Sequence, residues 1–464
     1  MAEPIRPIGR VIAGPQGSGV VAASTPRQGG GAIPLYQLGV GAIWRFLTTQ
    51  PPSFWLVCIY LFLEYVRPQS IYQAIAFFPW SFWTIILCLA AFLVEGRLFD
   101  LRGPANWWLG VFTAIIVVSS VRAYSPSDSY ANWSLWFSWI LIYLLISNIV
   151  VTEKRFLIFI LSFLLYNLKM SLFAVRSWAA IGFHFRDWGV YGAPGWFSNS
   201  GEFGIEMCVF VPIAVYFVAG MRPFWTRKKW LFFLAFPFTA VVGSVASSSR
   251  GALIGCGAVA LWAVMKGRHK VRGLVIAVTL AALVILIIPD QQMKRFSTAG
   301  SDNTSQLRLT YWRHGLEMLR DNPLTGIGYF NWMTYYNNHY GKGQLPHNIF
   351  IQAASELGYP GLIVLLVLMG VTLVTNHRTR LLAAQLGPRG RFMYFMAHGL
   401  DGALIGFIAS GFWVTVLYYP YMWINLALTV ALHRSVRSSY REAYVAGVGL
   451  PNSRTSTGAF PASR

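Results

Sequence analysis

The sequence predicts an all-α membrane protein that crosses the bilayer many times. Hydrophobic residues make up 55% of the 464 residues and charged residues only 11%, whereas an ordinary soluble domain carries about 25% charged residues. Apolar runs near 20 residues recur along the chain, and a helix of about that length crosses the hydrocarbon core of a bilayer. One long polar stretch, residues 290–346, interrupts the runs.

Twelve apolar runs are candidates for transmembrane helices. They lie at about 48–66, 77–94, 105–121, 133–151, 156–178, 202–220, 230–247, 250–265, 271–289, 347–375, 392–416 and 419–433. The four cysteines lie within these runs and have no CxxC spacing, so they indicate membrane packing rather than a metal site or a disulfide. No internal repeat is evident.

The distribution of positive charge predicts the orientation. Short cytoplasmic loops collect Lys and Arg, and 25 of the 37 Lys and Arg residues fall in alternate connections if the N-terminus is cytoplasmic. Both termini are therefore predicted to be cytoplasmic. The formal charge of +21 reflects this orientation and attraction to anionic lipid, so no nucleic-acid partner is needed to explain it.

This topology divides the chain into three parts. Residues 1–47 read as a disordered cytoplasmic arm, because residues 12–33 are rich in glycine and lack the apolar core of a signal peptide. Residues 48–433 form the transmembrane bundle, and residues 434–464 form a cytoplasmic tail. Within the bundle, residues 290–346 form a large loop on the outer side, long enough to fold.

The outer loop is predicted to contain an amphipathic helix. Leu309, Trp312, Leu316 and Leu319 recur at helical spacing, and Asn322-Pro323 ends the pattern. Such a helix would lie near the outer membrane–water boundary and cap whatever cavity the bundle encloses.

Arginines on the outer side are candidate ligands for an anionic, lipid-borne substrate. Arg250 follows a very short connection between two spans, Arg308 and Arg313 lie on the loop helix, and Arg186 lies in the loop before the sixth span. A guanidinium group is always charged and binds phosphate through a fork of donors. The alternatives are that Arg250 anchors the helix to lipid headgroups and that the loop arginines form a solvated face.

A polar file occupies the start of the tenth apolar run. Asn348, Gln352 and Glu356 are spaced four residues apart and share one face of a helix, and His347 precedes them. Polar side chains in a membrane helix face the protein interior or a wet cavity. The file either belongs to a reaction site or joins helices through hydrogen bonds, and His347 alone could be an ordinary interfacial histidine.

Three segments, in order, resemble motifs of the O-antigen ligase and polymerase superfamily, whose catalytic region is called the Wzy-C domain. Residues 346–362, PHNIFIQAASELGYPGL, resemble its H-N-x-x-x-Q-x-x-x-E-x-G-x-x-G-L signature. Residues 249–252, SRGA, and residues 308–328, RLTYWRHGLEMLRDNPLTGIG, resemble two further segments. The resemblance covers about 185–375, although residues 197–201 lack the proline of the family's N-P-N-like turn.

The resemblance implies a GT-C-like, inverting glycosyltransferase in the inner membrane of a bacterium. Its donor would be a glycan on undecaprenyl diphosphate, and its acceptor a hydroxyl at the periplasmic face. A ligase uses the lipid A core as acceptor, a polymerase a growing glycan, and an O-oligosaccharyltransferase a protein. Arg250 and Arg308 would stabilise the leaving diphosphate, and His347 would take or orient the acceptor proton.

Further site residues would bind the substrates. These are Asn348, Arg313, Arg186, Asn199, Gln352 and Glu356. The outward-facing acids are scattered and form no DxD pair, and the loop histidines have no metal-ligand spacing. We therefore expect neither a metal nor another cofactor.

Two other classes of function remain open. A lipid-linked oligosaccharide flippase would also have many spans and interior polar residues, but transporters tend to show repeated halves. The concentration of polar residues beside one outer loop favours an enzyme over that flippase, and over a non-catalytic scaffold for exopolysaccharide assembly.

Overall fold

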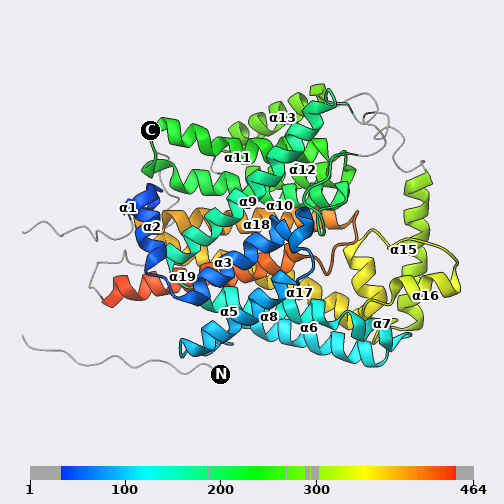
Figure 1. Ribbon diagram of the computed structural model, residues 1–464. Coiled ribbons are helices and arrows are strands. Elements are labelled where there is room, and N and C mark those ends of the chain that lie inside the picture. Colours follow the sequence, from blue (N-terminus) through cyan, green and yellow to red (C-terminus); the bar gives the residue numbers. More distant parts are fainter. Residues whose placement is uncertain (1–32, 185–188, 268, 288–292, 294–302, 446–464) are drawn as a thin grey trace, which may run out of the picture.

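The computed structural model describes residues 33–445, except 185–188, 268, 288–292 and 294–302. Regular structure in these ranges is helical throughout, with a few short 3₁₀ turns, so the predicted all-α fold is confirmed. Most helices run side by side in one bundle, with α15 (Asn303–Asp321) and α16 (Trp332–His339) beyond one end of it (Figure 1). We call this end the loop end.

Each of the twelve predicted apolar runs coincides with a helix. These helices are α3 (Pro52–Tyr65), α5 (Trp80–Val94), α6 (Pro104–Val121), α8 (Trp133–Ile149), α9 (Glu153–Ala180), α10 (Ser200–Met221), α11 (Arg227–Ala246), α12 (Arg250–Lys266), α13 (Lys270–Ile287), α17 (Ile349–Gln385), α18 (Arg391–Gly411) and α19 (Pro420–Val445). Short helices α1 (Ile33–Tyr36), α2 (Val40–Thr48), α4 (Pro68–Ile71) and α7 (Pro126–Ala131) connect or precede them. Residues 33–47, predicted to be part of a disordered arm, are thus largely helical.

Seven of the described helical segments are both long and apolar enough to cross a membrane. They are Pro104–Val121, Pro126–Ile149, Glu153–Ala180, Ser200–Phe224, Arg227–Ala246, Ile349–Gln385 and Gly387–Gly411. Several apolar helices support a multi-pass membrane protein, whereas the number of twelve crossings and the orientation of the termini stay predictions.

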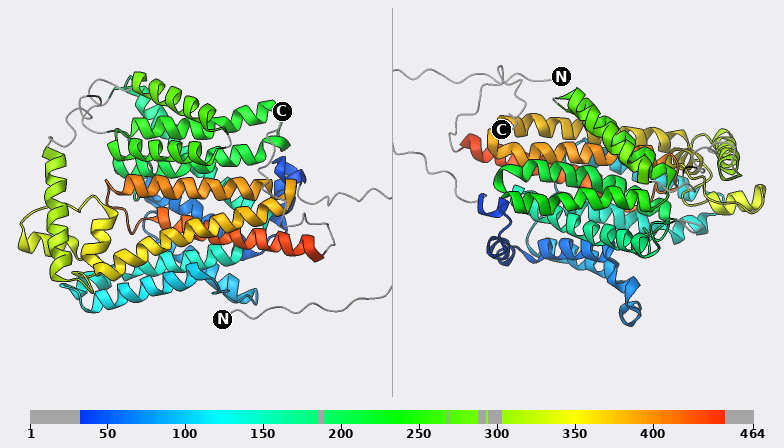
Figure 2. Two further views of the ribbon diagram at one scale, coloured as in Figure 1. Left: turned by 180° about the vertical axis from the view of Figure 1, so that it is seen from behind. Right: turned by 90° about the horizontal axis from the view of Figure 1, so that it is seen from above.

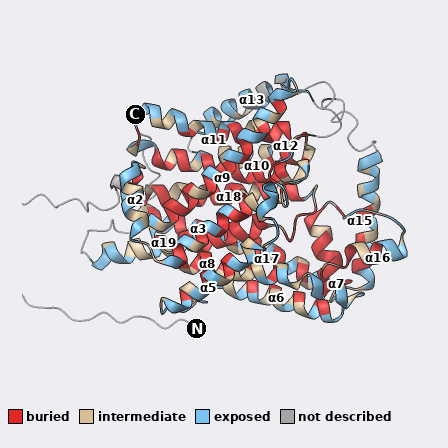
Figure 3. Ribbon diagram, in the orientation of Figure 1, coloured by how far each residue is buried: buried red, intermediate tan, exposed pale blue. Residues whose placement is uncertain are grey.

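The interior of the bundle is formed mainly by α18 and three helices that pack against it, α10, α17 and α19. Buried residues concentrate along these central helices, and α13 on the edge is largely exposed (Figure 3). The peripheral helix α5 packs against α3 and α8. Figure 2 shows from behind and from above that α15 and α16 project from the loop end and leave the sides of the bundle uncovered.

The long helix α17 contains a break and, near its far end, a buried ion pair. It has 37 residues and contains a break at Gly358, whose backbone is non-helical with φ +68°. Near its far end the Arg380 guanidinium contacts the Asp401 carboxylate at 2.5 Å, and Asn376 donates to the same carboxylate at 2.9 Å. These buried charges satisfy one another, as buried ion pairs must.

The loop helix α15 forms as predicted but presents a different face. Leu309 and Leu316 are about half exposed, whereas Tyr311 and Met318 are buried in a small core with Trp332 of α16. Apolar residues recur at helical spacing on two faces of α15. The aromatic side chains of α16 cover the face that carries Tyr311 and Met318. The predicted apolar face of α15 is therefore wrong at these two leucines.

Candidate functional site

A cavity of about 900 Å³ lies at the loop end, where α10, α12 and α17 begin and α18 ends. All three predicted catalytic residues line it together: Arg250, Arg308 and His347. Asn199 also lines it, as do residues of the segment after α18. We call it the arginine cavity. It falls within the range of about 300–1,000 Å³ that is common for ligand sites.

Arg250 is positioned by the turn that joins α11 to α12. Ser249 caps α12, its hydroxyl accepting from the Ala252 amide at 3.3 Å, as serine at an N-cap does. Ser248, which also lines the cavity, has φ +53°. A left-handed backbone at a residue other than glycine costs about 1–2 kcal/mol, so the turn holds an unfavourable conformation at the cavity wall.

His347 is held by contacts on both sides of its peptide. Its backbone has φ +50°, and its amide donates to the Thr415 hydroxyl at 2.7 Å. The Trp312 indole donates to the Pro346 carbonyl at 2.9 Å, and the His347 ring lies 3.3 Å from the Gln344 side-chain oxygen. The backbone of Pro346 and His347 is therefore fixed between α15 and the segment after α18, and the imidazole contacts Gln344.

The electrostatics of the cavity keep this imidazole neutral. Burial, and then the positive charge of Arg308, lower the pKa of His347 to about 4, compared with about 6.5 in water. The neutral ring can accept a proton at physiological pH, which a protonated imidazole cannot.

Asn348 has a structural task that the sequence motif did not specify. Its side-chain oxygen accepts from the Phe350 and Ile351 amides at 2.8 and 3.1 Å, and so caps α17. The residue is buried and does not line the arginine cavity. Asn348 therefore fixes where α17 begins, one residue after His347.

Gln352 and Glu356 face the protein interior, as the periodicity predicts, but they do not line the arginine cavity. The Glu356 carboxylate accepts from the Tyr418 hydroxyl at 2.9 Å and from the Trp332 amide at 3.3 Å, and Gln352 approaches it at 3.5 Å. These contacts join α17 to the start of α16 and to the segment before α19.

The motif DNPLTGIG wraps around the break in α17. Ile327 donates its amide to the Ser355 carbonyl at 2.8 Å, and Tyr359 donates to the Pro323 carbonyl at 2.9 Å. Gly326 has φ +65°, and a Cβ there would lie 2.3 Å from the Glu356 carbonyl carbon. Only glycine permits this approach. We call residues 321–328 with residues 355–359 the clasp.

The remaining predicted arginines are placed differently from Arg308. Arg313 is exposed on α15 and is not among the residues that line the arginine cavity. Arg186 lies outside the described residues. Asn199 lines the cavity as the N-cap of α10, its side-chain oxygen accepting from the Gly201 amide at 2.9 Å.

The sequence reading missed Glu202, which is the carboxylate in the described wall of the arginine cavity. Its side chain accepts from the Tyr419 hydroxyl at 2.9 Å, and its backbone carbonyl accepts from the Tyr421 hydroxyl at 2.9 Å. Its position three residues after Asn199, in the first turn of α10, was the available signal, since acids favour the first turn of a helix.

The described residues are predicted to hold no metal site. Among the described residues no three His, Cys, Asp or Glu side chains gather as a metal site would need. Metal independence stays a prediction that a chelator tests.

Comparison with known proteins identifies the family of the central segment. Residues 235–366 match the family Wzy_C, described as O-antigen ligase, and no curated protein matches the chain. The matched segment contains Arg250, Arg308 and His347, together with the clasp. Residues 235–366 thus match the Wzy_C model of the O-antigen ligase family, in the region where the sequence motifs lie.

Proposed function

We propose that the protein is a membrane glycosyltransferase that moves a glycan from undecaprenyl diphosphate to an acceptor hydroxyl at the periplasmic face. The observation that carries this proposal is that Arg250, Arg308 and His347 line one cavity. Members of the matched family are glycosyltransferase-like enzymes, and a lipid-linked glycan donor and a glycan acceptor suit that family.

The negative charge of the leaving diphosphate accounts for the role of the two arginines. When the bond between the anomeric carbon and the diphosphate oxygen breaks, negative charge develops on the diphosphate. Arg250 at the start of α12 and Arg308 on α15 approach the cavity from different elements. Preorganised cations stabilise such developing charge, and loss of one comparable group costs about 10²–10³ in rate in well-studied enzymes.

The acceptor explains His347. As the acceptor oxygen attacks the anomeric carbon, its proton must leave, and the neutral imidazole can take it. Attack from the face opposite the diphosphate inverts the anomeric configuration. Glu202 lies in the same wall and is the second candidate for the proton, held in place by Tyr419.

The acceptor class separates three activities that use the same chemistry. A ligase acting on the lipid A core is our first choice, followed by a polymerase and an O-oligosaccharyltransferase. The alternative from another class is a flippase for the same lipid-linked oligosaccharide.

The test uses purified protein in detergent with a lipid-diphosphate-linked oligosaccharide, candidate acceptors and EDTA. We expect transfer by the wild type, and losses of at least about 10² with Arg250→Ala, Arg308→Ala and His347→Ala. Arg320→Ala is the matched control, because Arg320 is exposed on α15 and does not line the cavity. Its rate should stay near that of the wild type.

Two results would overturn the proposal. Transfer that survives His347→Ala and Arg250→Ala together would remove the arginine cavity from the reaction. Movement of the labelled donor across a vesicle membrane without transfer to any acceptor would favour the flippase.

A further inference from the structure

A second cavity, of about 840 Å³, lies at the loop end between α3, α5 and α8. Three indoles contribute to its wall, from Trp80 at the start of α5, Trp139 on α8 and Trp196 in the segment before α10. We call it the tryptophan cavity. It shares no lining residue with the arginine cavity and lies outside the segment that matches the family.

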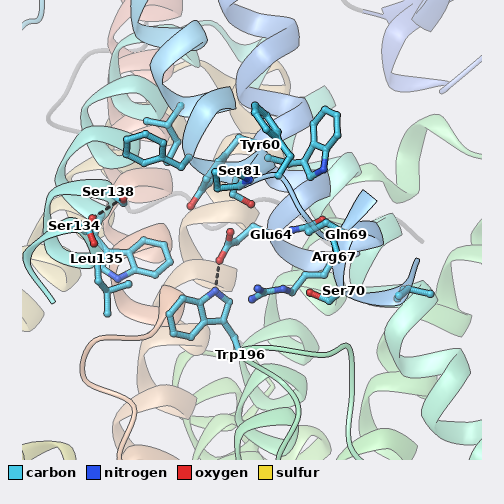
Figure 4. A pocket seen from close by; sticks show the side chains of 18 of the residues that line it. Tyr60, Glu64, Arg67, Gln69, Ser70, Ser81, Ser134, Leu135, Ser138 and Trp196 are labelled. Atoms are coloured by element: carbon cyan, nitrogen blue, oxygen red, sulfur yellow. Dashed lines mark hydrogen bonds between the residues drawn. The ribbon is translucent and has the colours of Figure 1, made fainter. Parts of the chain in front are cut away.

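Polar groups alternate with the aromatic faces in this cavity. Glu64, Arg67 and Gln69 line it near the end of α3, and serines line it from several elements. Figure 4 shows Glu64 and Arg67 beside the Trp196 indole, with Ser134 and Ser138 of α8 on the other side. An acyl chain would leave this many polar groups without partners, and burying a polar group in that way costs free energy.

The Trp196 indole is fixed by both charged residues. Its ring nitrogen donates to the Glu64 carboxylate, and the Arg67 guanidinium lies 6.0 Å from the ring centre. With one acid and one base at the same indole, this wall has little net charge. The arginine cavity differs, because Arg250 and Arg308 face a single acid there. The tryptophan cavity is therefore poorly suited to a diphosphate.

Two buried polar atoms in the tryptophan cavity have no hydrogen-bond partner among the described residues. They are the Nε of Arg67 and the side-chain oxygen of Gln69. Buried polar atoms in proteins nearly always have a partner. One atom is a donor and the other an acceptor, and neither is accessible in this conformation, so a ligand hydroxyl would reach one only after the Arg67 or Gln69 side chain turns toward the cavity.

We propose that the tryptophan cavity binds an oligosaccharide. Sugar rings have apolar C–H faces that pack on indoles, and hydroxyl groups at their edges that match Arg67, Gln69 and the serines. The cavity volume lies within the usual range for small-ligand sites. The ligand could come from either substrate of the proposed reaction, as distal sugars of the donor glycan or as sugars of the acceptor, and the chemistry of recognition is the same.

A chain of contacts joins the two cavities. The Trp196 and Tyr419 rings lie 4.9 Å apart, and the Tyr419 hydroxyl donates to Glu202 in the arginine cavity at 2.9 Å. Trp196 also lies only three residues before Asn199. A saccharide held against Trp196 would therefore lie beside the proposed reaction site.

The experiment measures binding without requiring transfer, so its failure is distinguishable from failure of the proposed function. The full chain is placed in lipid nanodiscs, and saturation-transfer NMR is recorded with two lipid-free probes. One probe is the oligosaccharide released from the lipid-linked donor by mild acid, and the other is the core oligosaccharide released from lipopolysaccharide. The probe that gives signals identifies the source of the ligand.

Two variants fill the cavity. Ser138→Trp does so from α8, and Ser70→Trp does so from the exposed end of α4. Each should reduce the signal by about tenfold or more. Ser127→Trp is the matched control, because Ser127 is exposed on α7 and lines neither cavity. It should bind as the wild type does.

Either of two results would overturn the inference. One is a signal that persists in both filled variants while they remain folded by size-exclusion chromatography. The other is the absence of signal with both probes. In that event, the phospholipid that co-purifies is compared between the wild type and Ser138→Trp, and a lower amount in the variant is the case to note. That case would assign the cavity to a lipid chain.

Discussion

The dependence of the transfer rate on pH is the sharpest test of the role of His347. Because the pKa of His347 is lowered to about 4 by burial and then by Arg308, the neutral ring persists above that pH and is lost as the pH falls through it. At pH 5 such a ring is roughly 90% neutral, whereas an ordinary histidine with a pKa of about 6.5 is roughly 3% neutral. We expect the rate at pH 5 to stay near its plateau, where an ordinary histidine would give a loss of roughly thirtyfold.

The perturbation is Arg308→Gln, which removes the charge but keeps a polar side chain. The rate should fall at every pH, and the midpoint of the acid limb should move upward toward 6.5. The shift should be incomplete, because burial is the larger cause and remains. The shape of the profile separates this effect from the loss of diphosphate binding, which lowers the rate equally across the range.

The assay is kcat/KM between pH 4 and pH 8, with folding checked at each pH. Two other charged groups line the same cavity, Arg250 and Glu202, so Glu202→Gln is measured in parallel. An acid limb near 6.5 in the wild type would refute a neutral buried His347. A limb near 4 that disappears in Glu202→Gln would show that Glu202, not His347, takes the proton.

Four further predictions follow from the clasp, the helix cap and the absence of a described metal site. Gly326→Ala should speed hydrogen exchange in α15 and α16, because the added Cβ meets backbone atoms of α17 and overpacking costs about 1–3 kcal/mol. The control is Gly341→Ala, because Gly341 also has a positive φ but has open space around it. An equal effect of Gly341→Ala would contradict this reasoning. Glu356→Ala should destabilise the fold by about 1–3 kcal/mol or more, because it leaves the Tyr418 hydroxyl without its hydrogen-bond acceptor. Glu356→Gln should restore part of the lost stability. Thermal unfolding of both variants at the wild-type midpoint would contradict this prediction. Asn348→Ala should cost about 1 kcal/mol and lower transfer, with recovery in Asn348→Asp; a fully active alanine variant would show that the cap is dispensable. EDTA should leave the wild-type rate unchanged, and restoration of a lost rate by Mg²⁺ would disprove metal independence.

The twelve helices could be predicted because each depends on local composition. An apolar run near 20 residues that crosses lipid as a single segment is helical, since a helix satisfies all its backbone hydrogen bonds within that segment. The face of α15 could not be read in the same way. Whether Leu316 or Met318 is covered depends on Trp332 and Tyr336, which arrive from another helix.

The arginine cavity could be predicted in outline because its residues lie in recognisable motifs. Arg250 precedes Gly251 at a helix start, His347 follows Pro346, and Arg308 lies in a segment that ends in the turn of residues 321–328. Glu356 shows the limit of that approach, because a motif does not distinguish a ligand from a residue that holds the ligand's neighbours. Only its contacts with Tyr418 and Trp332 place it in the clasp.

The tryptophan cavity could not be predicted from the sequence. Glu64 and Trp196 are separated by 132 positions and meet only when α3 packs beside the segment before α10. No spacing rule connects them, and the first 180 residues carry none of the motifs that directed attention to the arginines.

The break at Gly358 separates α17 into parts that can respond differently to the bilayer. Residues 359–385 would extend roughly 40 Å as a straight helix, and a hydrocarbon core is about 30 Å thick, so this part must tilt or protrude, and more so in a thinner membrane. Residues 349–357 are instead tied to α15 and α16 by the clasp. We expect the break at Gly358, which the clasp encloses, to let the long part of α17 adapt to membrane thickness while residues 349–357 and His347 keep their place beside α15.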